Sequence, residues 1–205
     1  MPAFALDSIS LSQTRSLHSD TDYVCAGLVL DGFPSQPKIL RIGNVNNGVE
    51  SNKTYPVELE FPGIPAWETD DKFVFSYMVI NHGGGSTDAV TAACKRVMTQ
   101  SPLMVFDPVK AAPDPKTGVP ACLVDTLFAA DDLVSWWNQI KDNFNGVPSD
   151  RCDGLVAIGR VCFFGSFLDQ LLLEPREISM NHLGMDSAGG CGPNSHYSVQ
   201  WSVKK

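Results

Sequence analysis

Hydrophobic and polar side chains alternate near both ends of the 205-residue chain. Aromatic and β-branched residues occupy every second position from Tyr197 to Val203, and this strict period of two predicts a strand with one solvated face. Ile9 and Leu11 alternate with serines near the N-terminus in the same way. We therefore expect both ends of the chain to lie in β-sheets.

Further strands are predicted between these ends. Residues 22–30 are apolar on both faces, as in a central strand, and an Asp-Gly pair then marks a turn at 31–32. Residues 39–42 predict a short strand, and alternation over 57–61 predicts another with one solvated face. Residues 73–80 are aromatic and β-branched throughout, which indicates a strand deep in the core.

Two segments carry the spacing of amphipathic helices. The first has apolar residues at helical intervals over 90–98, and Ser86 or Thr87 is placed to cap its start. The second runs from Asp131 to Phe144, with acidic residues at its start and Asn-Gly after its end. Residues 102–120 are Pro-rich and predict a surface loop around a short strand at 103–106. Residues 163–173 fit a helix or a buried strand equally well, because Gly165 weakens both interpretations.

These elements predict a mainly β protein, an antiparallel β-sandwich or flattened barrel with one or two short α-helices. We find no internal repeat and no domain boundary, so residues 1–205 are expected to form a single β-rich domain. Seventeen Gly and fourteen Pro suit a fold with frequent turns.

The formal net charge of −8 narrows the range of partners. An acidic surface repels phosphate backbones and anionic lipids, so nucleic acid and membranes are excluded as partners and a small-molecule ligand is expected. No apolar run is long enough to span a bilayer, and no secretory leader is visible. The expected compartment is therefore the cytoplasm, or the exterior if a leader has been removed. The sequence leaves the oligomeric state open.

Six cysteines occur without any CxxC pair or metal-ligand spacing. Cys25, Cys122 and Cys162 lie among apolar residues, where a thiol behaves as a small hydrophobe. We expect reduced thiols, and Cys152 with Cys191 as the pair that forms if the compartment is oxidising.

The segment from His18 to Asp22 places two carboxylates, Asp20 and Asp22, on the same side of the chain at the entrance of a strand. Oxygen ligands clustered in a loop suit Ca²⁺, so these two residues are the predicted metal ligands. The competing interpretation is a turn in which Asp20 or Asp22 accepts hydrogen bonds from nearby backbone N–H groups. No organic cofactor is indicated.

A Gly-rich segment at 181–196 concentrates the predicted catalytic residues, His182, Asp186, Cys191 and His196. A Cys–His pair oriented by an aspartate would follow the order nucleophile, base and orienting group. If the two terminal strands are neighbours, this segment could approach the predicted metal ligands. The competing interpretation is a long turn with a structural cysteine.

Three further residues are predicted to bind a ligand. His82 lies in a Gly-rich link that leads into the first helix, where backbone N–H groups can hold an anion, although the spacing matches no phosphate-binding motif. Trp67 lies in a loop and Trp136 at the edge of the second helix, where exposed rings can stack on a flat ligand. Each of the three could instead be structural.

The leading functional hypothesis is a small-ligand-binding β-sandwich protein, stabilised by calcium, with its site at strand-end loops. The alternative is a small pocket enzyme, either a thiol-dependent hydrolase or an acid/base isomerase or cyclase. This enzyme would use the His, Asp and Cys residues of the Gly-rich segment, with His18, Asp20 and Asp22 as other acid/base groups. A purely structural protein is a third hypothesis that no specific residue favours.

Overall fold

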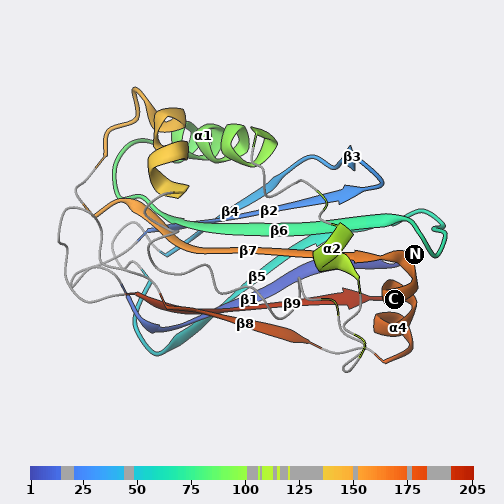
Figure 1. The fold of residues 1–205 in the computed structure, drawn as a ribbon. Coiled ribbons are helices and arrows are strands. Elements are labelled where there is room, and N and C mark those ends of the chain that lie inside the picture. Colours follow the sequence, from blue (N-terminus) through green and yellow to red (C-terminus); the bar gives the residue numbers. More distant parts are fainter. Residues whose placement is uncertain are drawn as a thin grey trace.

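The protein is described here by a computed structural model that covers residues 1–14, 21–43, 49–100, 106, 108–112, 115, 120, 136–149, 152–174, 177–183 and 195–205. Within these residues two antiparallel sheets pack face to face, as Figure 1 shows. Neither sheet closes on itself over these ranges, so the predicted β-sandwich is confirmed and a closed barrel is not formed. No helix within the described ranges is long and apolar enough to cross a membrane.

The first sheet contains both ends of the chain, and we call it the terminal sheet. Its strand order is β5-β1-β9-β8, with β1 at Ala3–Gln13 and β9 at His196–Lys204 in the middle. These two strands are antiparallel neighbours from the Ala3–Lys204 pair onward, which confirms the prediction from the terminal alternation. The outer strands are β5 at Lys53–Phe61 and β8 at Ile178–Leu183.

The second sheet is covered by helices on its outer face, and we call it the helix-covered sheet. Its central strands are β2 at Asp22–Leu30 and β6 at Lys72–Asn81, and β7 at Gly154–Phe164 pairs with β6. The other side of β2 pairs first with β4 at Lys38–Ile42 and then with the short β3 at Phe33–Pro34.

Aromatic side chains fill the space between the sheets. Phe4 of β1 lies against three rings of the opposite sheet and against Trp201 of its own sheet, at centroid distances of 5.7 to 6.3 Å. Such pairs contribute roughly 0.5–1.5 kcal/mol each beyond the area that they bury. The fully buried members of this cluster are Phe4, Phe73, Phe75, Phe163 and Trp201.

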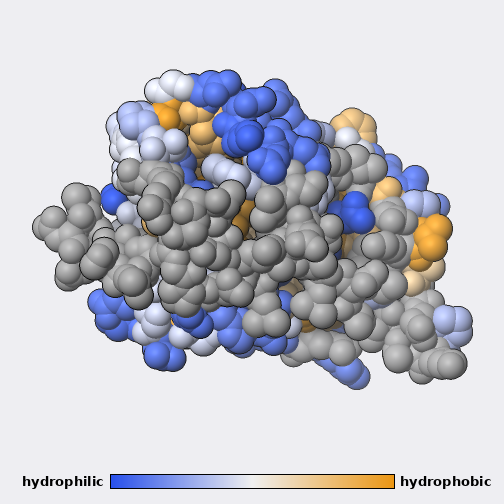
Figure 2. Space-filling view, turned by 60° about the vertical axis from the view of Figure 1, so that its left-hand side comes forward, coloured by the Kyte–Doolittle hydropathy of each residue, from blue (hydrophilic) through white to orange (hydrophobic). Residues whose placement is uncertain are grey.

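The helix α1 at Thr87–Gln100 covers the outer face of β2 and β4. Its buried residues are the five that the apolar spacing predicts, Val90, Ala93, Cys94, Val97 and Met98. The Ser86 hydroxyl accepts a hydrogen bond from the Ala89 N–H at 3.3 Å, so the predicted cap is present. The solvent-facing side of this layer is hydrophilic, as the blue area at the top of Figure 2 shows.

The other helices are short. Residues 136–140 are helical and continue into the 3₁₀ helix η3 at Lys141–Phe144, so the C-terminal part of the second predicted helix is confirmed, while its start lies outside the described residues. A four-residue helix, α2 at Pro108–Ala111, lies within the segment predicted as a loop. The predicted strand at 103–106 falls almost wholly outside the described residues.

Three strands were not predicted from the sequence, the two-residue β3 and the longer β7 and β8. β7 is apolar on both faces, so it has no alternation, and Gly154 and Gly159 weaken the signal further. β8 takes up residues that were assigned to the Gly-rich loop, among them His182, which is therefore a strand residue. In the ambiguous segment 163–173, β7 ends at Phe164 and α4 follows at Gly165–Leu173.

The cysteines divide into two groups. Cys25 and Cys94 are free and buried between β2 and α1, as the sequence predicts for Cys25. A hydrogen bond with the Cys94 thiol, together with burial, raises the pKa of Cys25 well above its usual value. Cys152 and Cys162 are disulfide-bonded, so the expectation of reduced thiols is wrong for these two. Cys122 and Cys191 lie outside the described residues, and the Cys152–Cys191 pairing stays a prediction.

Candidate functional site

The structure separates the predicted site residues. Asp22, His82, His182 and His196 lie at one end of the sandwich, where β2, β7 and β9 begin and β6 and β8 end. Trp67 lies toward the opposite end, where its indole N–H donates to Asp169 of α4. Trp136 packs against the apolar side chains that are buried between α1 and the helix-covered sheet. His18, Asp20, Asp186 and Cys191 lie outside the described residues.

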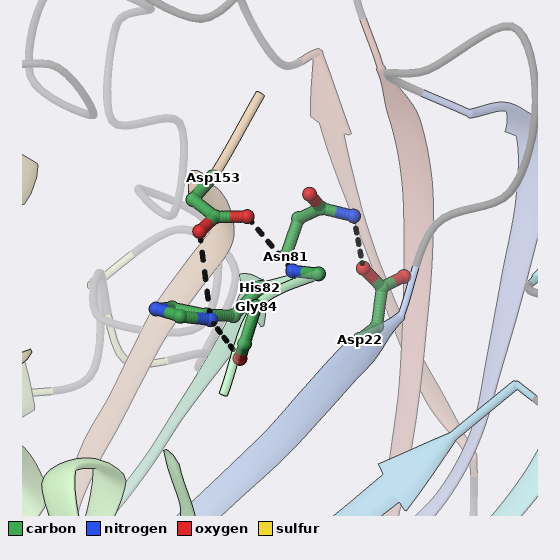
Figure 3. Close-up of polar contacts among 6 residues, drawn as sticks. Asp22, Asn81, His82, Gly84 and Asp153 are labelled. Carbon is green, nitrogen blue, oxygen red and sulfur yellow. Dashed lines mark hydrogen bonds and ion pairs between the residues drawn. The ribbon is translucent and has the colours of Figure 1, made fainter. Parts of the chain in front are cut away.

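Asp22 is fully buried at the first position of β2. One carboxylate oxygen accepts a hydrogen bond from the Asn81 amide at 3.2 Å, as Figure 3 shows, and the other accepts from the Tyr197 hydroxyl at 2.7 Å. Both oxygens are therefore held by neutral donors of β6 and β9. Within the described ranges, no group of three or more His, Cys, Asp or Glu side chains is arranged to hold a metal ion.

Tyr77 and His182 form a second polar contact between the two sheets. The Tyr77 hydroxyl lies 2.7 Å from His182 Nε2 and 3.2 Å from the sulfur of Met180. Burial lowers the pKa of His182 to about 4, so its ring is neutral at pH 7. Burial also raises the pKa of Tyr77 well above its usual value, so this phenol keeps its proton.

The Tyr77 ring can occupy its position because residue 159 is a glycine. The two residues face each other in the β6–β7 pairing, and a Cβ atom at position 159 would lie 2.2 Å from the Tyr77 ring carbon Cζ. Only a residue without a side chain leaves room for the ring at this point. The absence of a side chain on β7 therefore allows Tyr77 to reach His182 on the other sheet.

His82 directly follows β6 and is 1% exposed. Its Nδ1 donates to the backbone carbonyl of Gly84 at 3.0 Å and lies 3.5 Å from a carboxylate oxygen of Asp153 (Figure 3). The other Asp153 oxygen accepts from the Gly83 N–H at 2.8 Å, and the ring stacks on Phe144. Because a carbonyl can only accept, Nδ1 carries the proton, and the buried Nε2 has no hydrogen-bond partner among the described residues.

We call this region the polar end, defined by Asp22, Tyr77, Asn81, His82, Asp153, His182 and Tyr197. The predicted approach of Asp22 to the segment around His182 is confirmed, because Asp22 bonds to Tyr197 and His182 pairs with Tyr197 across the β8–β9 ladder. The side chains are buried and mostly saturated by one another. Two of these contacts, Asp22 with Tyr197 and Tyr77 with His182, connect the two sheets, and the others lie at the end of the helix-covered sheet.

An apolar cavity of about 620 Å³ lies at the opposite end of the sandwich. One wall is the β2–β3 hairpin, whose turn places Asp31 and Gly32 at φ values of 47° and 85°. The other wall is the segment that connects β5 with β6. We call this the apolar cavity. Its apolar lining comes from Leu28, Leu30, Phe33, Pro34, Phe61, Pro62, Ile64, Pro65 and Ala66.

A second cavity of about 410 Å³ lies on the other side of the hairpin, against Met98 and Thr99 of α1. Pro34, Ser35 and Gln36 line both cavities. Ser35 fixes this segment to β2, because its N–H and its hydroxyl both donate to the Leu28 carbonyl, at 2.8 and 2.9 Å. A single stretch of chain therefore separates the two cavities.

Neither cavity is lined by Trp67, Trp136 or His82. Trp67 follows the lining residue Ala66, but it packs edge-on against Phe73. The residues that form the apolar cavity had one weak signal in the sequence, which is large apolar side chains set among Gly and Pro. Phe33 stands between Gly32 and Pro34 and is 79% exposed.

Comparison with family models, with curated protein sequences and with solved structures finds no match. The functional interpretation therefore depends on the geometry of the two ends.

Proposed function

We propose that this protein binds a small apolar molecule in the apolar cavity. The observation that carries this proposal is a cavity of about 620 Å³ with predominantly apolar walls at the open end of the sandwich. Small-molecule sites in proteins usually measure about 300–1,000 Å³ and are lined by hydrophobic side chains with few polar groups. The cavity lies at strand ends, but at the end opposite to Asp22 and the Gly-rich segment, on which the expected ligand site was based.

The walls of the cavity are held in place before any ligand arrives. Leu28 and Leu30 belong to a central strand, and Phe61 ends a strand of the other sheet. Prolines at positions 34, 62 and 65 restrict the backbone of the loops between them. A site with little conformational freedom loses little entropy when a ligand binds, which favours affinity.

The test is a titration with Nile red, a neutral apolar dye that fluoresces in apolar surroundings. We expect saturable binding of one dye per chain. The variant Ala66→Trp fills the cavity from an exposed position and should weaken binding at least tenfold, whereas Thr69→Trp, which lies outside the lining, should leave binding unchanged.

Two outcomes would contradict the proposal. One is the absence of saturable binding, or equal binding by both variants. The other is a dimer in sedimentation that Ala66→Trp converts to a monomer, because the cavity would then hold part of a second copy of the chain.

Calcium binding is a separate proposal that rests on Asp20 and Asp22. Asp22 already accepts two hydrogen bonds from neutral donors, so a cation would have to replace the Asn81 amide or the Tyr197 hydroxyl. Melting temperatures in EGTA and in millimolar Ca²⁺ test it, because an ion that binds only the native state must raise them. An unchanged melting temperature removes calcium from the function.

The alternative function, a small pocket enzyme, is favoured by one observation at the polar end. His82 has Asp153 beside Nδ1 and, among the described residues, no partner at Nε2, which is the arrangement of a base with its orienting carboxylate. Fast, selective labelling of Cys191 by iodoacetamide at neutral pH would support a thiol-dependent enzyme. Slow labelling of the native protein would exclude this version.

The disulfide bonds of Cys152 and Cys162 bear on the compartment. Disulfides persist in oxidising environments and are rare in the cytosol, so we propose that the chain matures in an oxidising compartment rather than in the cytoplasm. Non-reducing peptide mapping of protein purified from its source tests this. Free thiols at positions 152 and 162 would restore the cytoplasmic expectation.

A further inference from the structure

Three charged side chains stand among the residues that line the apolar cavity. They are Asp31 in the turn of the β2–β3 hairpin, Lys38 at the start of β4, and Asp71 just before β6. Their formal charges sum to −1. The remaining side chains of the described lining are uncharged. The electrostatic preference of the cavity for a cationic, neutral or anionic ligand therefore depends on these three side chains.

The ammonium of Lys38 already contacts a group of the protein itself. Its ammonium lies over the Phe61 ring, 5.6 Å from the centroid, and the ring face attracts a cation. The same ammonium helps to lower the pKa of Glu60, although the larger part of that shift comes from the hydrogen bond with Lys204. Lys38 is therefore occupied by groups of the protein itself.

The two carboxylates retain unused acceptor atoms. Asp31 is exposed, and its side chain has no hydrogen bond or ion pair within the described ranges. Asp71 uses one oxygen to accept from the Glu68 N–H at 2.9 Å and keeps the other. Their backbones are fixed, because the Asp31 N–H donates to the Lys72 carbonyl and the Asp71 carbonyl accepts from the Gly165 N–H.

We propose that the apolar cavity selects an apolar cation, a molecule with a hydrocarbon body and a protonated amine that faces Asp31 and Asp71. This inference rests on the proposed function, since it names the ligand class of the same cavity. Charge complementarity carries it: two anchored carboxylates with unused oxygens outnumber one ammonium, which lies over the Phe61 ring. The net charge of −8 of the whole chain acts in the same direction.

The test compares three molecules with the same hydrocarbon chain, octylammonium, octanol and octanoate, as competitors that displace Nile red. We expect octylammonium to bind about tenfold more tightly than octanol at low salt, and octanoate to bind more weakly than octanol. Added salt should reduce the preference, because exposed charges are screened. In the double variant Asp31→Asn/Asp71→Asn the preference should disappear, while the amide oxygen introduced at position 71 can still accept from the Glu68 N–H.

The matched control is Asp70→Asn, which changes an exposed neighbour outside the lining and should keep the preference. Equal binding of octylammonium and octanol, or a preference that survives in the double variant, would overturn the inference while the proposed function stands. Tightest binding by octanoate would also overturn it and would assign the selection to Lys38. Failure of all three to displace bound Nile red would overturn the inference too, whereas the absence of saturable Nile red binding would overturn the proposed function.

Discussion

The two ends of the sandwich differ in how the two sheets meet. At the polar end, Asp22 and His182 accept or share hydrogen bonds with tyrosines of the facing sheet, and little of either side chain is exposed. At the other end the sheets part around an apolar cavity, and Phe33 stands largely in solvent. One end joins the sheets, and the other leaves apolar surface uncovered.

This difference bears on how functional residues are inferred. Clusters of His and Asp suggested catalysis or metal binding, yet those that the structure describes mainly connect strands. Most buried polar groups in proteins are hydrogen-bonded, so a polar residue between two sheets has a structural reason to be there. Uncovered apolar surface has no such reason, and it is a stronger indication of a binding site.

The largest expected effect concerns pH and His182. The pKa of His182 is about 4 in the folded protein and about 6.5 in an unfolded chain, so between these values the unfolded state binds more protons. Stability should therefore fall as pH decreases from 6.5 to 4, by about 3 kcal/mol from this residue. Urea unfolding at a series of pH values measures it.

The variant His182→Gln should flatten this pH dependence, and His196→Gln, on the half-buried first residue of β9, serves as the matched control. An unchanged slope in His182→Gln would show that His182 is not the buried neutral group at the polar end.

The next effect compares two glycine substitutions. Gly159→Ala should destabilise the protein by at least about 2 kcal/mol, because its Cβ would overlap the Tyr77 ring. Gly32→Ala meets no atom within 4 Å and should cost only about 1 kcal/mol, through its positive φ. Urea unfolding at pH 7 measures both. Equal costs would mean that the polar end tolerates displacement of Tyr77.

The smallest effect belongs to the apolar end. Phe33→Ser removes a ring that is 79% exposed, so stability should change by less than about 0.5 kcal/mol. Nile red binding should nevertheless weaken, because Phe33 lines the apolar cavity. A loss of stability comparable to that of Gly159→Ala would contradict the contrast between the two ends.

Local patterns predicted much of the fold. The apolar spacing of α1 names its five buried residues, and alternation places β1 and β9 in a sheet. β7 could not be recognised, because a strand buried on both faces has no period and its glycines argue against a strand. Gly159 is explained only by Tyr77, which lies far earlier in the chain, so no local window contains the reason for it.

The candidate site was less predictable than the fold. The approach of Asp22 to the strand that contains His182 could be expected from adjacent terminal strands. The burial of the Asp22 carboxylate could not be expected, because it depends on the hydrogen bond from Tyr197. Only the packing of the two sheets brings Tyr197 into contact with Asp22. The apolar cavity was not foreseen, because the hairpin near Phe33 and the loop near Ile64 meet only when the sheets are packed.

The stretch from Pro34 to Gln36 has a consequence for how the molecule would respond to more than one guest. It lines both cavities, with the apolar cavity on one face and the α1 side on the other. A guest that pushes this stretch from either side changes the room available on the opposite side. If a guest displaced this stretch, then by thermodynamic reciprocity each guest would alter the affinity of the other by the same factor.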